Sequence, residues 1–232
     1  MTAAKGSDPY DPNEFPPFAV TADLVVLAVR PPSLDALLVR RTTGPHTGKW
    51  ALPGGFVAPD QGLSAAAQFK LSNKTGVEIE RSHLEQLHTF GAPERDERMR
   101  VVSVAYLALV ADLQEPELED AKWISVASLR GKDLAFDHME ILEHGIERAR
   151  SKLEYTTLAT TFCGPEFTMA ELRSVDETAC GQGLDAANFN RKVMATEGFV
   201  EATGRTESTG RGPPARTFVA GPATMLHPPI VR

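Results

Sequence analysis

The stretch GGFVAPDQGLSAAAQFKLSNKTGV, residues 54–77, gives the strongest indication of the fold of this chain. It opens with a Gly-rich turn that directly follows a strand-like run. The pattern predicts a helix over residues 63–74, capped by Ser64 or beginning nearer to Gly62. The segment closes at Gly76, a residue that favours the left-handed conformation in which many helices end. A strand, a tight turn, a helix and a terminal glycine therefore form one compact unit.

This unit resembles the Nudix box, the phosphate- and metal-binding element of Nudix hydrolases, with the pattern G-x5-E-x7-R-E-U-x-E-E-x-G-U, where U is apolar. The positions that determine shape match this pattern: Gly55, Leu71, Gly76 and Val77. The positions that carry chemistry differ, because Gln61 replaces the first Glu, Phe69 replaces the Arg, and Lys70, Asn73 and Lys74 replace the three helix Glu residues. The flanking string KWALPGGFV, residues 49–57, is also typical of the family.

The loss of the box carboxylates predicts the loss of the metal. Carboxylates at i, i+3 and i+4 share one helix face, and Mg²⁺ or Mn²⁺ needs such anionic oxygen ligands. Two ammonium groups repel a divalent cation, so we expect neither a metal site nor catalytic residues here. The competing hypothesis is a Nudix pyrophosphatase acting on ADP-ribose-like nucleoside diphosphates. Its displaced carboxylates would come from Glu78, Glu80, Glu94, Asp96 and Glu97.

Composition sets the broad class of the protein. The chain has 232 residues, of which 42% are hydrophobic and 24% charged, as in an ordinary globular protein of one or two domains. The sequence has no membrane-spanning run and no signal peptide, so we expect a cytoplasmic protein without a membrane partner. The net charge of −7 is unevenly distributed. Residues 158–232 hold 7 Lys and Arg against 8 Asp and Glu, so a local basic face can form there.

Residues 18–155 have the element order of a mixed sheet covered by helices. Residues 1–17 are rich in proline and predict a flexible arm. Apolar runs predict strands over 20–29, 36–40, 84–90, 101–113 and 121–126, and an amphipathic pattern predicts a helix over 139–153. His138, near the start of that helix, is interpreted as structural. We therefore expect an α/β/α sandwich as in the Nudix fold, followed by a domain boundary at residues 155–164.

Several residues of this first domain are candidates for binding a ligand. Arg40 and Arg41 end a predicted strand just before the box, where they would suit a diphosphate, although two solvated surface arginines would give the same pattern. The charged loop at residues 92–100 is interpreted as a solvated hairpin loop rather than a partner-binding loop. The predicted ligand-binding set is Arg40, Arg41, Gly54, Gly55, Lys70 and Lys74.

Residues 165–220 predict a winged helix-turn-helix. Thr168 and Glu171 form a capping-box pattern before a helix over 169–179, and Asp185 is a good N-cap for a second helix. Two short strands at 199–203 and 217–220 flank a long wing loop at 204–216 that is rich in Arg. Such a unit binds duplex DNA through phosphate and base contacts, or binds another protein. The predicted DNA-binding residues are Thr168, Asn188, Asn190, Arg191, Lys192, Arg205, Arg211 and Arg216.

The combination of a degenerate Nudix box with this second domain resembles the NrtR family of Nudix-related transcriptional regulators. The match is sharpest in LDAANFNRK, residues 184–192, and in the Gly/Pro/Arg wing. The resemblance implies a homodimeric repressor of NAD metabolism genes that binds a palindromic operator. It also implies that ADP-ribose or NAD is the effector, with no cofactor required. The family often has Arg where Asn190 stands and Arg-Pro where Pro213-Pro214 stands, which puts operator sequence and affinity in doubt. Residues 221–232 are expected to be a tail.

Overall fold

The computed structural model describes residues 14–79, 84–111, 114–129, 134–208, 213–227 and 229–230. Its elements, in chain order, are β1 (Ala19–Arg30), β2 (Ser33–Arg40), β3 (Trp50–Ala51), β4 (Gly54–Phe56), α1 (Leu63–Thr75), β5 (Glu85–Phe90), β6 (Val101–Val110), β7 (Ala121–Ser125), α2 (Val126–Leu129), α3 (His138–Tyr155), the 3-10 helix η3 (Thr157–Phe162), β8 (Phe167–Thr168), α4 (Met169–Cys180), α5 (Ala186–Ala195), β9 (Val200–Glu207) and β10 (Ala215–Ala220). Within these ranges no helix combines the length and the apolar character that a membrane span requires.

The N-terminal part is a mixed sheet between helices. The main strand order is β3-β2-β1-β6-β5, with β4 pairing with β1 and β7 pairing with β2. Only the β1–β6 pair is parallel among these strands; the other pairs are antiparallel. Strand β1 is buried on both faces, because Leu24 and Val26 pack on the α1 side while Val25 and Leu27 pack on the α3 side. This two-sided burial explains why its sequence is almost continuously apolar.

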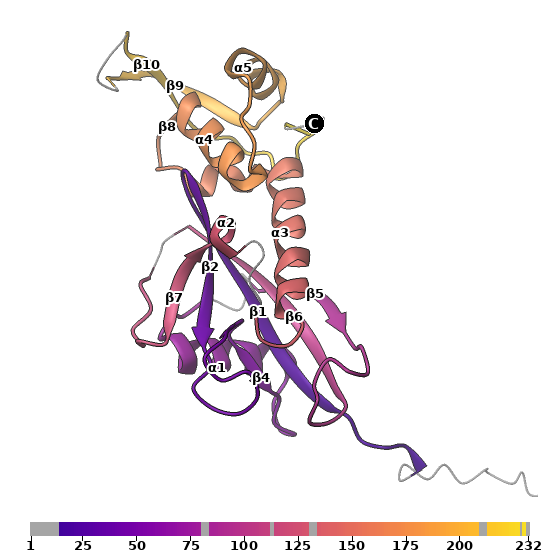
Figure 1. Ribbon diagram of the computed structural model, residues 1–232. Helices are drawn as coiled ribbons and strands as arrows, with labels where there is room; N and C mark the ends of the chain where they lie inside the picture. Colours follow the sequence, from indigo (N-terminus) through magenta and orange to yellow (C-terminus); the bar gives the residue numbers. More distant parts are fainter. Residues whose placement is uncertain are drawn as a thin grey trace, which may run out of the picture.

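Helix α3 lies unusually close to the central strand. A Cβ atom at Gly145 would be 2.5 Å from Val25 Cγ1, so only glycine allows this approach. The helix begins beside the sheet and extends to the C-terminal part of the chain, where α4, α5 and the β9–β10 hairpin lie (Figure 1). One helix therefore connects the two parts physically.

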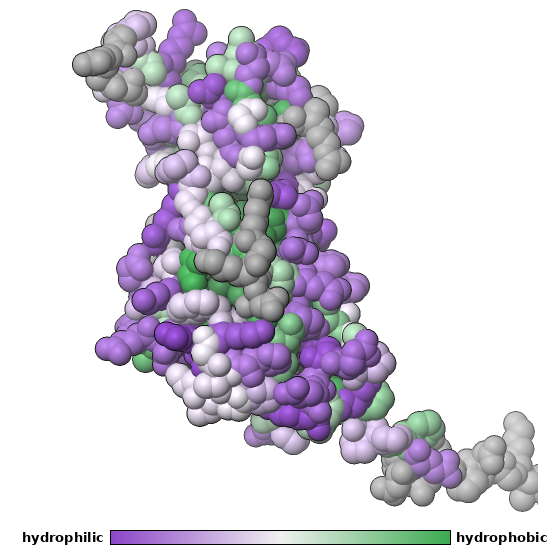
Figure 2. All heavy atoms as spheres, in the orientation of Figure 1, coloured by the Kyte–Doolittle hydropathy of each residue, from purple (hydrophilic) through white to green (hydrophobic). Residues whose placement is uncertain are grey.

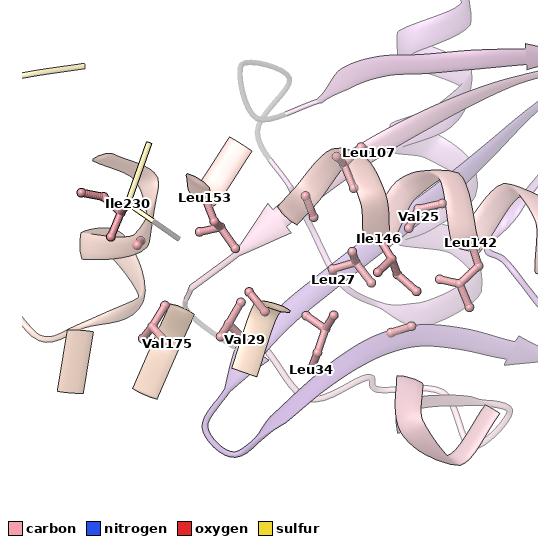
Figure 3. Packing of buried hydrophobic residues seen from close by; sticks show 14 of the residues in the cluster. Val25, Leu27, Val29, Leu34, Leu107, Leu142, Ile146, Leu153, Val175 and Ile230 are labelled. Carbon is pink, nitrogen blue, oxygen red and sulfur yellow. The ribbon is translucent and has the colours of Figure 1, made fainter. Parts of the chain in front are cut away.

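The C-terminal part is a winged helix-turn-helix that shares its core with the sheet. Strand β10 lies between β8 and β9, and α4 packs against α3, β1 and β2. Figure 3 shows Val29 and Leu34 of the β1–β2 hairpin beside Val175 of α4 within one buried apolar cluster. The same cluster continues to Leu153 and Ile230. Apolar contact, rather than a bare linker, holds the winged helix on the sheet.

The structure adds detail to three local expectations. Helix α1 has Gly62 as its N-cap and no side-chain cap, so of the two predicted starts the one nearer to Gly62 is confirmed and Ser64 is not the cap. The segment at 155–164 is mostly the ordered helix η3, in which Ala159 is fully buried. The expected tail is packed over its described residues, because Leu226 N–H donates to the Tyr155 carbonyl at 2.8 Å and the Leu226 side chain is buried.

Candidate nucleotide pocket and nucleic-acid interface

A pocket of about 440 Å³ lies where β1, β4, the end of β2 and α1 meet the loops before β6 and α3. Its volume falls in the range of small-molecule sites. The residues that line it include Thr21, Asp23, Arg40, Arg41, Gly54, Gly55, Phe56, Asn73, Lys74, Arg95, Asp96, Arg98, Phe136 and His138. Five of the six predicted ligand residues line this pocket. Lys70 does not line it, and its Nζ lies over the exposed Phe69 ring at 5.7 Å.

Asp23, a single carboxylate on the apolar strand β1, lies buried at the pocket. Thr21 and Ser103 donate hydrogen bonds to its Oδ2 at 3.0 and 2.5 Å. Gly54 packs directly against it, since a Cβ there would be 2.2 Å from Asp23 Oδ1. The absence of a side chain at position 54 lets the box turn approach the strand this closely.

The charged loop at residues 92–100 is not simply solvated, which corrects the sequence interpretation. Arg95 and Asp96 are each less than a tenth exposed. Arg95 donates two hydrogen bonds to Asp137 at 2.8 and 2.7 Å, and its guanidinium lies 4.0 Å from Asp23. Buried charges persist because they are paired in this way. The loop therefore joins the pocket to Asp137, the residue just before α3.

Aromatic rings and guanidinium groups form one wall of the pocket. The Arg41 guanidinium lies over the Phe136 ring at 4.8 Å, and Arg98 lies over Phe136 and Phe56 at 5.7 and 5.4 Å. Burial, followed by the nearby Arg98 charge, lowers the pKa of Arg41. Hydrogen bonds from Arg98 hold the pKa of the Asp96 carboxyl below its usual range. Flat rings beside cations suit a ligand that carries both a base and phosphates.

Lys74 reaches into the pocket from α1. Its Nζ donates a hydrogen bond to the Gly54 carbonyl oxygen. Burial lowers the pKa of Lys74, and the nearby Asp23 carboxylate opposes that shift. Position 74 is where the Nudix pattern has a metal-binding Glu, so an ammonium group stands in place of a carboxylate.

His138 lines the pocket and is hydrogen-bonded within the protein. Its Nδ1 accepts a hydrogen bond from the Leu52 N–H at 2.9 Å, and its Nε2 lies 4.0 Å from Asp23 Oδ1. Burial lowers the pKa of His138, which favours the neutral ring. An Nδ1 acceptor places the ring proton on Nε2, facing Asp23.

The displaced carboxylates of the competing enzyme hypothesis do not converge. Glu78, Glu94 and Glu97 are exposed, while Asp96 is bonded to Arg98. Glu80 lies outside the described residues. Across the described part of the chain, no group of three or more His, Cys, Asp and Glu side chains could hold a metal ion. The residues at this pocket therefore do not fit the metal that the Nudix box implies.

Sequence reasoning missed several pocket residues: Asp23, Arg95, Arg98 and Phe136. Asp23 gave a signal, because it is the one carboxylate in an apolar strand, and such a residue needs a polar partner. Arg95 and Arg98 gave none, since a charged loop looks the same whether it faces water or folds over a pocket.

The first helix of the winged domain has the predicted capping box. Glu171 N–H donates to Thr168 Oγ1 at 3.3 Å, and Thr168 N–H donates to Glu171 Oε2 at 2.6 Å. Thr168 is only 1% exposed. Both its hydroxyl and its amide are used within the protein, so we remove Thr168 from the DNA-facing set.

The second helix, α5, presents a polar face. Asp185 caps it as predicted, with the Asn188 N–H donating to Asp185 Oδ1 at 2.8 Å. Asn188, Asn190 and Arg191 are exposed, and Arg191 donates to Asn188 Oδ1 at 2.7 Å. Lys192 differs, because its Nζ turns inward and donates to the Ile230 carbonyl at 3.1 Å. Figure 2 shows a largely hydrophilic surface over the α5 and wing end of the molecule.

The wing consists of longer strands and a shorter loop than predicted, so Arg205 and Arg216 lie on β9 and β10. Arg205 is bonded to Glu166, whose carboxylate also accepts from Thr217. Hydrogen bonds from Thr217 and then Arg205 hold the pKa of the Glu166 carboxyl below its usual range. Arg216 is exposed, and Arg211 lies outside the described residues.

Comparison with known proteins agrees with this division of the chain. The NUDIX domain model matches residues 19–145, and the NrtR DNA-binding winged helix domain model matches residues 160–219. The chain belongs to the NrtR family of Nudix-related transcriptional regulators. It is 35% identical over 210 residues to the ADPR responsive transcriptional repressor NtrR of Acinetobacter baylyi, covering 88% of this chain and 83% of that protein.

Two solved structures of an NrtR protein resemble this one. Shewanella oneidensis NrtR complexed with a 27mer DNA matches with a TM-score of 0.71 at 32% identity, covering 88% of this chain and 94% of that chain. The NUDIX domain of the same protein complexed with ADP ribose matches with a TM-score of 0.55 at 36% identity, covering 60% and 93%. The predicted family and fold class, a Nudix-like sandwich with a C-terminal winged helix, are confirmed.

Proposed function

We propose that this protein is a DNA-binding transcriptional repressor of NAD metabolism genes whose DNA affinity is set by ADP-ribose. One observation carries this proposal. The same fold holds a pocket lined by cationic and aromatic side chains and a winged helix whose second helix exposes Asn and Arg side chains. The NrtR relatives support both halves, since one is named for its response to ADP-ribose and one was solved with DNA.

The pocket suits ADP-ribose by its chemistry. The rings of Phe56 and Phe136 offer surfaces on which an adenine can stack. Arg41, Arg98 and Lys74 supply the positive charge that a diphosphate requires. NAD carries the same diphosphate and adenine, so it is the second nucleotide to test.

The winged helix suits duplex DNA. The exposed face of α5 carries Asn188, Asn190 and Arg191, and amide and guanidinium groups are the side chains that pair with adenine and guanine edges in the major groove. Arg205, Arg211 and Arg216 of the wing would neutralise phosphates. We propose a homodimer on a palindromic operator, because two-fold symmetry in a protein is matched by two half-sites in its DNA.

The Nudix domain acts as a sensor and not as a hydrolase in this proposal. The box lacks its carboxylates, and of the described alternatives only Asp96 lines the pocket, where it is bonded to Arg98. A sensor that hydrolysed ADP-ribose would erase its own signal. Because the proposed partners are DNA and a small nucleotide, we place the protein in the cytoplasm and require no cofactor.

Two assays test this function directly. A gel shift on the duplex upstream of the protein's own gene should show a complex that weakens steeply with salt. Incubation with ADP-ribose and Mg²⁺ should release no AMP above the uncatalysed background. No shift at low salt would contradict the regulator, and AMP release at ordinary enzyme rates would favour the pyrophosphatase.

A further inference from the structure

The most unusual feature of the pocket is the ammonium group at position 74. The Nudix pattern places a divalent cation beside this face of the box helix, held by carboxylates. Here Lys70, Asn73 and Lys74 occupy the three carboxylate positions, and only Asn73 and Lys74 line the pocket. One amide oxygen and one ammonium group cannot hold a hard cation, which needs several anionic oxygen ligands.

Lys74 is held in place by the box itself. Its Nζ donates to the carbonyl of Gly54, and Gly54 is wedged against Asp23 so tightly that no side chain fits there. An ammonium group has three N–H donors, and the Gly54 carbonyl uses one of them. Asp23 and Arg41 line the same pocket, and their charges affect the pKa of Lys74 with opposite signs.

We propose that the Lys74 ammonium takes the electrostatic place of the divalent cation, so that this pocket binds the diphosphate of a nucleoside diphosphate without a metal. The inference rests on the proposed function, because it assumes that an ADP-ribose-like ligand enters this pocket. Arg41 and Arg98 line the same pocket and add to its positive charge. The Gly54–Lys74 contact therefore provides a fixed cation where the family pattern provides a bound one.

A tethered ammonium differs from a metal in one decisive respect. It attracts phosphate oxygens, but it has no open coordination position at which to bind water and lower the pKa of that water. An ammonium group in place of the glutamate at position 74 thus preserves attraction for the diphosphate while removing the means of attacking it. Binding without cleavage is the property that a sensor needs.

The test is calorimetric titration of the full-length protein with ADP-ribose, in EDTA and again in Mg²⁺. The variants are Lys74→Met, which removes the charge at similar length, and Lys74→Arg, which keeps it. Lys70→Met is the matched control, because Lys70 is on the same helix but outside the pocket lining. Thermal denaturation of each variant checks that it folds.

The wild-type affinity should be the same within about two-fold in EDTA and in Mg²⁺. Lys74→Met should lose roughly ten- to a hundred-fold in affinity, as expected for a charged hydrogen bond. Lys74→Arg should keep most of the wild-type affinity for ADP-ribose, and Lys70→Met should leave that affinity unchanged. Wild-type binding that requires Mg²⁺, or Lys74→Met binding as tight as wild type, would overturn the role of Lys74 while leaving the effector assignment intact. No ADP-ribose binding in either buffer would overturn the effector assignment and this inference together.

Discussion

Gly54 lies so close to Asp23 that a Cβ atom at position 54 would be 2.2 Å from Asp23 Oδ1 and 2.6 Å from the carbonyl of Ala22. This contact joins the box turn to the central strand and fixes the carbonyl to which Lys74 binds. Steric crowding therefore explains why position 54 is glycine in this chain, independently of catalysis.

Gly54→Ala should therefore destabilise the protein by roughly 3 kcal/mol, because backbone must move to admit the methyl group. Urea denaturation measures this change. Gly62→Ala is the control, since a Cβ there meets nothing within 4 Å, and it should cost less than about 1 kcal/mol. Equal effects from the two substitutions would show that the close approach to Asp23 does not matter.

Arg95→Ala should be strongly destabilising, because it leaves Asp137 without its bidentate partner beside the start of α3. Removing one member of a buried ion pair typically costs about 3 to 5 kcal/mol. The measurement is the free energy of unfolding in urea, with Arg100→Ala as the control. Arg100 is more exposed, and its guanidinium donates to the Ala92 carbonyl and lies over the exposed Phe18 ring, so its loss should cost about 1 kcal/mol. A mild effect at Arg95 would mean that the loop is not held over the pocket as described.

Arg191 and Lys192 are adjacent on α5 but should respond differently to substitution. Arg191→Ala should weaken operator binding about ten-fold or more and reduce the slope of log affinity against log salt by about 1. Lys192→Ala should leave that slope unchanged and lower the thermal midpoint instead, because Lys192 anchors the Ile230 carbonyl. Salt-dependent gel shifts and thermal melts separate the two effects. A slope change in Lys192→Ala alone would reverse the assignment of the DNA-facing side.

Asp176 should make stability depend on pH. It is 1% exposed, its two carboxylate oxygens have no hydrogen-bond partner among the described residues, and burial raises its pKa to about 8. An unfolded Asp has a pKa of about 3.9, so the folded protein holds the extra proton between these values. Stability should then fall as pH rises from about 4 to 8, by up to about 5 kcal/mol.

The isosteric Asp176→Asn variant should remove most of this pH dependence and be the more stable protein at pH 8. Urea denaturation at pH 5, 6.5 and 8 provides the comparison. The exposed Asp60→Asn variant is the control and should keep the wild-type trend. If wild type and Asp176→Asn change in parallel, the carboxyl is not buried in its neutral form.

Local sequence signals predicted local structure well in this protein. The capping box of Thr168 and Glu171, the Asp185 cap and the left-handed Gly76 at the end of α1 each depend on a few adjacent residues. These features follow from hydrogen bonds and backbone conformations that the neighbouring residues determine by themselves. The sequence of the degenerate box likewise distinguished the positions that determine the turn and helix from those that have lost the metal-binding carboxylates.

Contacts between distant segments were not predictable in the same way. Arg95 and Asp137 are separated by 42 residues, and Lys192 and Ile230 by 38. Neither pair has a spacing that a helix or strand imposes, so the charged loop and the C-terminal segment looked like solvated chain in the sequence. Tertiary packing, by contrast, buries Arg95 and Leu226.

The proposed function requires that the pocket and the winged helix are energetically coupled. The most direct measurement is fluorescence anisotropy of a labelled duplex from the protein's own upstream region, titrated with protein at zero and at saturating ADP-ribose. Mg²⁺ is present in both, so the outcome does not depend on the role of Lys74. ADP-ribose should change the DNA affinity at least about five-fold, and DNA should change the ADP-ribose affinity by the same factor. Identical DNA affinities with and without saturating ADP-ribose would contradict it.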